Sequence, residues 1–130
     1  MNNIYSYINK TVDVRVDYPI GSEHPKYEFI YPVNYGHLPG TISIDNKEID
    51  VYILGVTEPI VNPGSKVIPV FTGRAIAVIH RIDDDDDKLI VIPEEMPDLT
   101  DLQIKDATFF QEQHYSSAII RDPNERIRGM

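Results

Sequence analysis

Acidic side chains are the residues best able to do chemistry in this chain of 130 residues, and two of them flank one short turn. Asp45 begins the polar stretch 45–48, and Asp50 begins the alternating run that follows it. A bend between them could aim both carboxylates at one end of a sheet, where hard cations such as Mg²⁺ find oxygen ligands. The alternative for Asp45 is that Asp-Asn is simply favourable turn chemistry. Asp50 shares a strand face with Tyr52 and Leu54, so its carboxylate needs a partner or an ion.

A second acidic segment covers residues 83–87, which are five consecutive aspartates. Like charges this close repel one another by roughly 1 kcal/mol per pair even in bulk water. A divalent cation would offset the repulsion, because Mg²⁺ accepts one or two carboxylates and keeps several water ligands. The alternative, which the run by itself favours, is a solvated loop between two strands.

The segment Tyr31-Pro-Val-Asn-Tyr-Gly36 places two tyrosines four positions apart around a proline and an asparagine. As structure it predicts a proline-stiffened turn with rings packed on the sheet. As function, hydroxyl and amide groups are suitable donors to phosphate oxygens. Metal ligation by histidine is not predicted, because the histidines have no metal-binding spacing; they are His24, His37, His80 and His114.

These groups must be positioned by short elements, since ten prolines and seven glycines divide the chain. Alternating apolar and polar residues predict strands over 11–18, 67–71, 74–82 and 88–92, and a hairpin over 41–55 with arms at 42–44 and 49–53. Thr100 and Gln103 fit a capping box, which predicts one helix from there to about residue 114. Five or six strands and one late helix predict a mainly β (α+β) domain, a small closed barrel with the helix packed on it.

Composition narrows the classes of function. The chain has 12 Lys and Arg against 21 Asp and Glu, and a formal net charge of −9 disfavours a general nucleic-acid-binding role. The absence of cysteine excludes disulfides and thiolate metal sites. No apolar run approaches the ~18 residues of a membrane span, and residues 1–10 lack a secretory pattern. We therefore expect one domain over residues 1–130, cytoplasmic and without a membrane partner.

Over about residues 14–115 these motifs resemble those of the family I soluble inorganic pyrophosphatases. Residues 31–36 are similar to the family's Tyr-Pro-x-Asn-Tyr-Gly, which implies that Tyr35 contacts phosphate. Residues 44–51 resemble Asp-Gly-Asp-Pro-x-Asp-Val, whose aspartates bind metal and the attacking water, and Asp45 and Asp50 match the outer two. Residues 26–28 resemble Lys-Tyr-Glu, which implies a phosphate-binding role for Lys26 and an acidic site residue at Glu28.

The resemblance extends to the second half of the chain. Residues 83–88 are similar to an Asp-x-x-x-x-Asp-x-Lys stretch shortened by two, which implies metal roles for Asp83 and Asp86 and a phosphate role for Lys88. Residues 109–115 resemble the helical Phe-Phe-Glu-His-Tyr-Lys with two extra residues, and the match carries substrate binding to Tyr115. Asp17, nine positions before Lys26, is a further acidic candidate.

Three features depart from the family pattern. The middle aspartate of the signature, a candidate for activating the nucleophilic water, is Lys47 in this chain. The lysine after the late tyrosine is Ser116. The strand pair that carries a phosphate-binding arginine is absent, and the sequence leaves open whether Arg74 or Arg81 replaces it.

The resemblance implies a five-stranded oligonucleotide/oligosaccharide-binding-like barrel that hydrolyses pyrophosphate to two phosphates with Mg²⁺, or alternatively Mn²⁺, through a metal-activated water. The alternatives are a catalytically weakened relative that binds metal and a phosphorylated ligand, and a hydrolase of another small phosphoester. A homo-oligomer is also expected, because a small barrel gains stability by burying surface in a partner. The implied roles are catalysis by Asp50, Asp45 and Tyr35, metal binding by Asp45, Asp50, Asp83 and Asp86, and substrate binding by Lys26, Tyr35, Lys88 and Tyr115, with Asp17 and Glu28 as further candidates.

Overall fold

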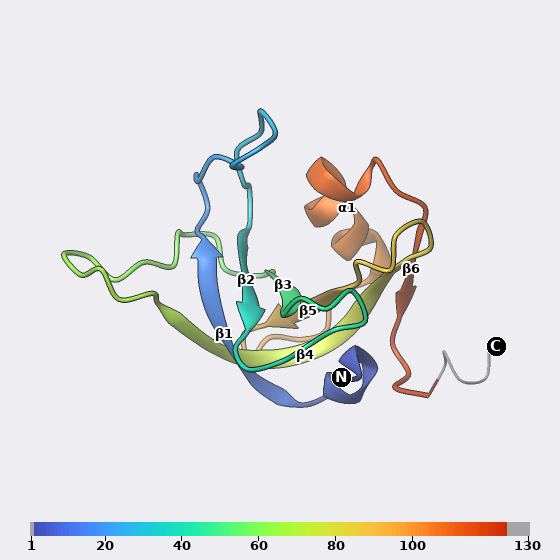
Figure 1. The fold of residues 1–130 in the computed structure, drawn as a ribbon. Coiled ribbons are helices and arrows are strands. Elements are labelled where there is room, and N and C mark those ends of the chain that lie inside the picture. Colours follow the sequence, from blue (N-terminus) through green and yellow to red (C-terminus); the bar gives the residue numbers. More distant parts are fainter. Residues whose placement is uncertain (1, 125–130) are drawn as a thin grey trace.

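The computed structural model describes residues 2–124, and Figure 1 shows their arrangement. Six strands form one sheet in the order β1-β2-β3-β5-β4-β6, and a further pairing of β1 with β4 closes the first five into a barrel. The barrel with one helix confirms the predicted fold class. The elements are η1 (Ile4–Tyr7), β1 (Thr11–Tyr18), β2 (Asn34–Leu38), β3 (Ile49–Ile53), β4 (Val70–Arg81), β5 (Lys88–Ile92), α1 (Asp101–Glu112) and β6 (Ser117–Ile120).

The barrel interior is built from alternate residues of its strands. In β1 the residues Val12, Val14 and Val16 are buried while their neighbours in sequence are exposed. This period-two pattern places one face of each strand in a common apolar core, to which all five barrel strands contribute. The alternation in the sequence therefore predicted β1 with its correct ends.

The outer face of the barrel is covered where α1 packs on it. Thr100 caps the helix by accepting from the N–H of Gln103 at 3.1 Å, and the Gln103 side chain accepts from the N–H of Thr100 at 2.8 Å. Ile104 is fully buried in a second apolar cluster with Tyr52 and Ile90. All five residues of β5 are buried, and the four after Lys88 are apolar. Among residues 2–124 no helix has the length and apolar character to cross a membrane.

The first arm of the hairpin predicted over 41–55 is wrong. Ile42 and Ile44 are 51% and 54% exposed in a loop, and β3 pairs with β2 and β5 instead. Thr41 ties the neck of this loop, since its Oγ1 donates to the Leu38 carbonyl at 2.7 Å and accepts from the Ile49 N–H at 3.0 Å. The two hydrogen bonds of Thr41 therefore hold residues 42–44 in a loop, although their alternating pattern is typical of a strand.

The prediction of a turn over 31–36 is wrong for its second half, because β2 begins at Asn34. The Asn34 side chain is buried and satisfies three backbone groups of neighbouring loops. Its Oδ1 accepts from the N–H of Ile20 and of Ile60, both at 3.0 Å, and its Nδ2 donates to the Glu58 carbonyl at 3.1 Å. Asn34 is therefore a structural anchor at the start of a strand.

Gly36 lets β2 approach β1 closely. A Cβ atom at this position would lie 1.7 Å from the carbonyl oxygen of Arg15, which no side chain tolerates. The two strands pair antiparallel with Val16 opposite Gly36, and the register shifts between Val16 and Tyr18. The glycine that ends the sequence motif is thus required by strand packing.

Other boundaries differ in smaller ways. The two runs predicted at 67–71 and 74–82 form one strand, β4, with a register shift between Ala75 and Ala77 where it pairs with β5. The helix ends at Glu112 rather than near residue 114. The sequence did not predict β6, which has only four residues and pairs with β4 alone.

Candidate active site

Asp50 and Lys88 are brought together by the pairing of two strands. β3 and β5 run parallel, and Asp50 lies opposite Lys88 in their register. The Lys88 ammonium donates to Asp50 Oδ2 at 2.7 Å and lies 2.9 Å from Asp86 Oδ1. The Lys88 side chain is 3% exposed, whereas those of Asp50 and Asp86 are 30% and 33% exposed. A buried ammonium thus joins two half-exposed carboxylates from distant parts of the sequence.

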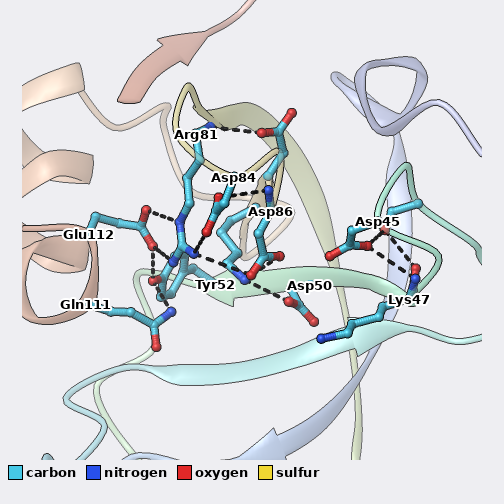
Figure 2. A network of polar contacts seen from close by, with 12 residues as sticks. Asp45, Lys47, Asp50, Tyr52, Arg81, Asp84, Asp86, Gln111 and Glu112 are labelled. Atoms are coloured by element: carbon cyan, nitrogen blue, oxygen red, sulfur yellow. Dashed lines mark hydrogen bonds and ion pairs between the residues drawn. The ribbon is translucent and has the colours of Figure 1, made fainter. Parts of the chain in front are cut away.

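Arg81 ends β4 beside this group and is held by the helix. Its Nε donates to Glu112 Oε1 at 2.8 Å and its Nη2 to Oε2 at 2.7 Å. Its Nη1 lies 3.3 Å from Asp84 and 3.4 Å from Asp86 (Figure 2). The guanidinium carbon lies 3.8 Å from the centre of the Tyr115 ring. Although burial opposes its charge, the hydrogen bonds and charge of Glu112 raise the pKa of Arg81 above its usual value.

A second contact of Glu112 connects the network to the barrel. The Tyr52 hydroxyl donates to Glu112 Oε2 at 2.6 Å and accepts from Gln111 Nε2 at 2.7 Å (Figure 2). Burial and the neighbouring Glu112 charge raise the pKa of Tyr52 well above 10.0. Tyr52 therefore remains a hydrogen-bond donor at neutral pH.

Tyrosine rings form one wall of the site. Tyr18 and Tyr31 stack with ring centres 4.9 Å apart, and Tyr35 lies beside both. Burial raises the pKa of Tyr31 to about 12. Burial, followed by the charge of Asp50, raises the pKa of Tyr35 well above 10.0. These phenols stay protonated near neutrality, so each keeps an O–H that can donate to an anion.

These groups line one pocket of about 720 Å³, which is large enough for a small ligand. Among residues 2–124, its wall carries the cations Lys26, Lys47, Arg81 and Lys88 and two carboxylates, Asp50 and Asp86. Lys88 and Arg81 are paired with carboxylates, whereas Lys26 and Lys47 form no ion pair within residues 2–124. The other lining residues are Tyr18, His24, Pro25, Tyr27, Phe29, Tyr31, Tyr35, Gln111, His114 and Tyr115.

The structure brings together part of the predicted set of site residues. Asp50 and Asp86 meet in the pocket, and the wall includes all four predicted substrate-binding side chains. Arg81 lies in the pocket, whereas Arg74 pairs with Asp98 at 2.6 Å outside it. The four substrate-binding side chains in the wall are Lys26, Tyr35, Lys88 and Tyr115.

Other predicted acidic residues have partners outside the pocket wall. Asp45 accepts from the Ser43 hydroxyl and from the Lys47 N–H within its own loop (Figure 2). Asp83 accepts from the N–H of Ser116 at 2.7 Å, which fastens the start of the acidic loop to the segment between α1 and β6.

The two weaker acidic candidates also lie apart from the carboxylate pair. Asp17 contacts His37 at 2.6 Å. Glu28 lines a cavity of the adjacent loop 23–30. The acidic side chains assembled around the ammonium of Lys88 are therefore Asp50 and Asp86.

The carboxylates of this pocket form a pair rather than a larger cluster. Within residues 2–124 no group of three or more His, Cys, Asp or Glu side chains is arranged to hold a metal ion. Asp50 and Asp86 share one cationic partner, and the Lys88 ammonium occupies the point on which their oxygens converge. Two carboxylates suffice for Mg²⁺, which completes its six ligands with water and phosphate oxygens.

A sequence model of the family described as inorganic pyrophosphatase matches residues 2–120. The chain belongs to the inorganic pyrophosphatase family. It is 32% identical over 117 residues to the inorganic pyrophosphatase of Rickettsia prowazekii, a match that covers 75% of this chain and 64% of that protein. It is 27% identical over 137 residues to that of Bacillus sp. strain PS3, covering 84% of this chain and 79% of the relative. This chain thus spans less than two thirds of the length of the Rickettsia pyrophosphatase.

Solved structures of inorganic pyrophosphatases have a similar fold. The crystal structure of the protein from Ehrlichia chaffeensis matches with a TM-score of 0.66 at 18% identity, covering 91% of this chain and 89% of that one. The protein from Helicobacter pylori matches with a TM-score of 0.65 at 17% identity, covering 94% and 90%. At such identities the likeness concerns the fold, and it agrees with the closed barrel of this pyrophosphatase family member.

Sequence reasoning missed several residues of the pocket and its support. Glu112 was assigned no role, yet it anchors Arg81, and its place in the last turn of a helix gave no sign of that contact. Tyr18 could have been found, because it ends an alternating strand just before a Pro-Ile-Gly turn. His24 lines the pocket and its Nδ1 accepts from the N–H of Lys26 and Tyr27 at 3.0 and 3.1 Å, a contact that fixes the loop carrying Lys26.

Proposed function

We propose that this protein hydrolyses pyrophosphate to two phosphates at the pocket around Asp50, Asp86 and Lys88, with Mg²⁺ as its cofactor. The observation that carries the proposal is the convergence of a carboxylate pair, four cationic side chains and several phenols in one pocket. Phosphoryl transfer depends mainly on positioning and on neutralising charge, which such a set of groups supplies. The relatives are named inorganic pyrophosphatases, which supports hydrolysis over a purely binding role.

Asp50 and Asp86 are the residues that would hold the Mg²⁺ ion, or Mn²⁺ as the alternative. A divalent ion in such a site neutralises phosphate charge and lowers the pKa of a bound water. Asp45 and Asp83 are hydrogen-bonded elsewhere, so the proposal gives them no part in metal binding. This set is narrower than the four aspartates that the family signature implies.

The remaining groups of the pocket bind and orient the phosphates. Lys26 and Lys88 provide ammonium donors, and charge-assisted hydrogen bonds of this kind are about twice as strong as neutral ones. Tyr35 provides a protonated phenol next to Asp50. The Asp50 carboxylate lines the pocket and is 30% exposed, so it is the acceptor within reach of an attacking water.

Phosphate release tests the proposal. The wild-type protein should release phosphate from pyrophosphate in Mg²⁺ and lose this activity in excess chelator. Asp50→Asn should lower the rate by at least about 100-fold, a usual cost for removing one acid–base or charge-stabilising group. Asp106→Asn, an exposed change of the same type on the helix, should leave the rate unchanged. Release that persists in chelator, or that survives in Asp50→Asn, would reject the scheme.

A homo-oligomer and a cytoplasmic location stay predictions. Exposed apolar side chains in the loop before β3 and on the helix are available for self-association; they include Ile42, Ile44 and Phe109, at 51%, 54% and 60% exposed. Burial of such groups would stabilise a small domain.

A further inference from the structure

Lys47 is a cation of the pocket whose side chain has no structural task. Its backbone holds the loop between β2 and β3, since its N–H donates to Asp45 Oδ1 at 3.2 Å and its carbonyl accepts from the Ser43 N–H at 2.7 Å. The side chain is exposed, lines the pocket and points toward Asp50 (Figure 2). In the described part of the chain no carboxylate forms an ion pair with its ammonium.

The other pocket cations divide into two kinds. Lys88 and Arg81 are buried and neutralised, the first by Asp50 and Asp86 and the second by Glu112. Lys26 resembles Lys47, because it is exposed and forms no ion pair within residues 2–124. Two uncommitted ammonium groups from separate loops therefore face the same cavity.

This arrangement makes the pocket attractive to anions even without added metal. The lining carries four cations against two carboxylates, in a chain whose net charge is −9. A cleft lined by one sign of charge raises the local concentration of the opposite ion, and an ammonium forms short charge-assisted hydrogen bonds with phosphate. Neutralised cations contribute less to that field, so the contribution of Lys26 and Lys47 dominates.

We infer that Lys47, together with Lys26, binds a phosphate group of the ligand directly, so that this pocket holds a diphosphate without a metal ion. The inference takes from the proposed function only the class of ligand, a diphosphate. It makes Lys47 a residue that determines specificity for that ligand. Binding then depends on fixed ammonium groups, while hydrolysis depends on Mg²⁺.

Calorimetric titration with methylenediphosphonate, a diphosphate that cannot be hydrolysed, tests this inference in excess chelator. The wild-type protein should bind the probe without metal. Lys47→Asp and Lys47→Gln should each weaken that binding by at least about tenfold, the usual cost of one hydrogen bond between charged groups. Both variants should fold normally, because only the backbone of Lys47 makes structural contacts.

The matched control is Lys66→Asp. Lys66 is an exposed lysine in the loop before β4 and does not line the pocket, so this variant changes the net charge as Lys47→Asp does. Metal-free binding to Lys66→Asp should equal that of the wild type. The inference would be overturned if Lys66→Asp weakened metal-free binding as much as Lys47→Asp does. It would also be overturned if the wild-type protein bound the probe only with Mg²⁺.

Binding and phosphate release, measured on the same proteins, test this inference and the proposed function independently. Metal-free binding that depends on Lys47, without phosphate release in Mg²⁺, would overturn pyrophosphate hydrolysis and support the role of Lys47. Phosphate release in Mg²⁺ without any metal-free binding would support hydrolysis and overturn the role of Lys47.

Discussion

Glu112→Gln should destabilise the protein strongly, because it removes the main partner of a buried charge. The side chains of Arg81 and Glu112 are 4% and 7% exposed and share two hydrogen bonds, at 2.8 and 2.7 Å. Removing one member of a buried ion pair leaves the other uncompensated, at a cost of about 3–5 kcal/mol in the free energy of unfolding. Asp84 and Asp86 remain at 3.3 and 3.4 Å from the guanidinium, so we expect the lower end, about 3 kcal/mol.

Urea unfolding measures this loss, and Asp98→Asn is its control. Asp98 pairs with Arg74 at 2.6 Å, but its side chain is 56% exposed, so the loss should stay below about 1 kcal/mol. Glu112→Gln should also lower phosphate release, because Arg81 contacts both Asp86 and the Tyr115 ring. The reasoning fails if Glu112→Gln costs no more free energy than Asp98→Asn.

Two further predictions concern packing and ionisation. Gly36→Ala should lower the free energy of unfolding by about 3 kcal/mol, since its Cβ would lie 1.7 Å from Arg15 O; an unchanged urea midpoint would contradict the close approach of β1 and β2. Burial raises the pKa of Tyr31 to about 12 and those of Tyr35 and Tyr52 well above 10.0, whereas unfolded phenols ionise near pH 10. The contribution of Tyr31 to stability is therefore complete below pH 10 and is lost as pH rises through about 12, and the pKa values of Tyr35 and Tyr52 shift in the same direction. Between these values phenolate absorbance should be lower in folded than in urea-unfolded protein, and equal absorbance would refute the burial of these hydroxyls.

The fold was predictable wherever local patterns and burial agree. β1 alternates cleanly because only its inner face is buried, and the helix start was marked by a capping box that the structure contains. Patterns misled where tertiary contacts decide. Ile42 and Ile44 alternate like a strand, yet the hydrogen bonds of Thr41 place them in a loop. Residues 31–36 were predicted as a turn from their local composition. The start of β2 depends instead on Asn34, which hydrogen-bonds to loops distant in sequence.

The residue types that line the pocket could be predicted from the sequence, but the ion pairs between them could not. The sequence indicated that Asp50 needs a partner or an ion, and its partner is Lys88, at a spacing that parallel strands alone create. Five consecutive aspartates look equivalent in sequence, but it is Asp86 whose carboxylate lies 2.9 Å from the Lys88 ammonium. Asp83 is instead bonded to the backbone after the helix. The local sequence does not predict that Asp86 pairs with Lys88 or that Asp83 bonds to the backbone. Both contacts depend on how the loop and the strands are arranged in the folded protein.

The electrostatics of Asp86 give a physical reason why a cation belongs beside it. Burial raises the pKa of Asp86, and the ammonium of Lys88 lowers it without cancelling the effect. The ionised carboxylate is therefore held at a cost that another positive charge would reduce. Asp45 lies in its own loop, hydrogen-bonded to nearby donors, so it gains less from an added cation. Lys88 is the cation that joins Asp86 to Asp50, so a metal ion at the proposed site would have to share these two carboxylates with the Lys88 ammonium.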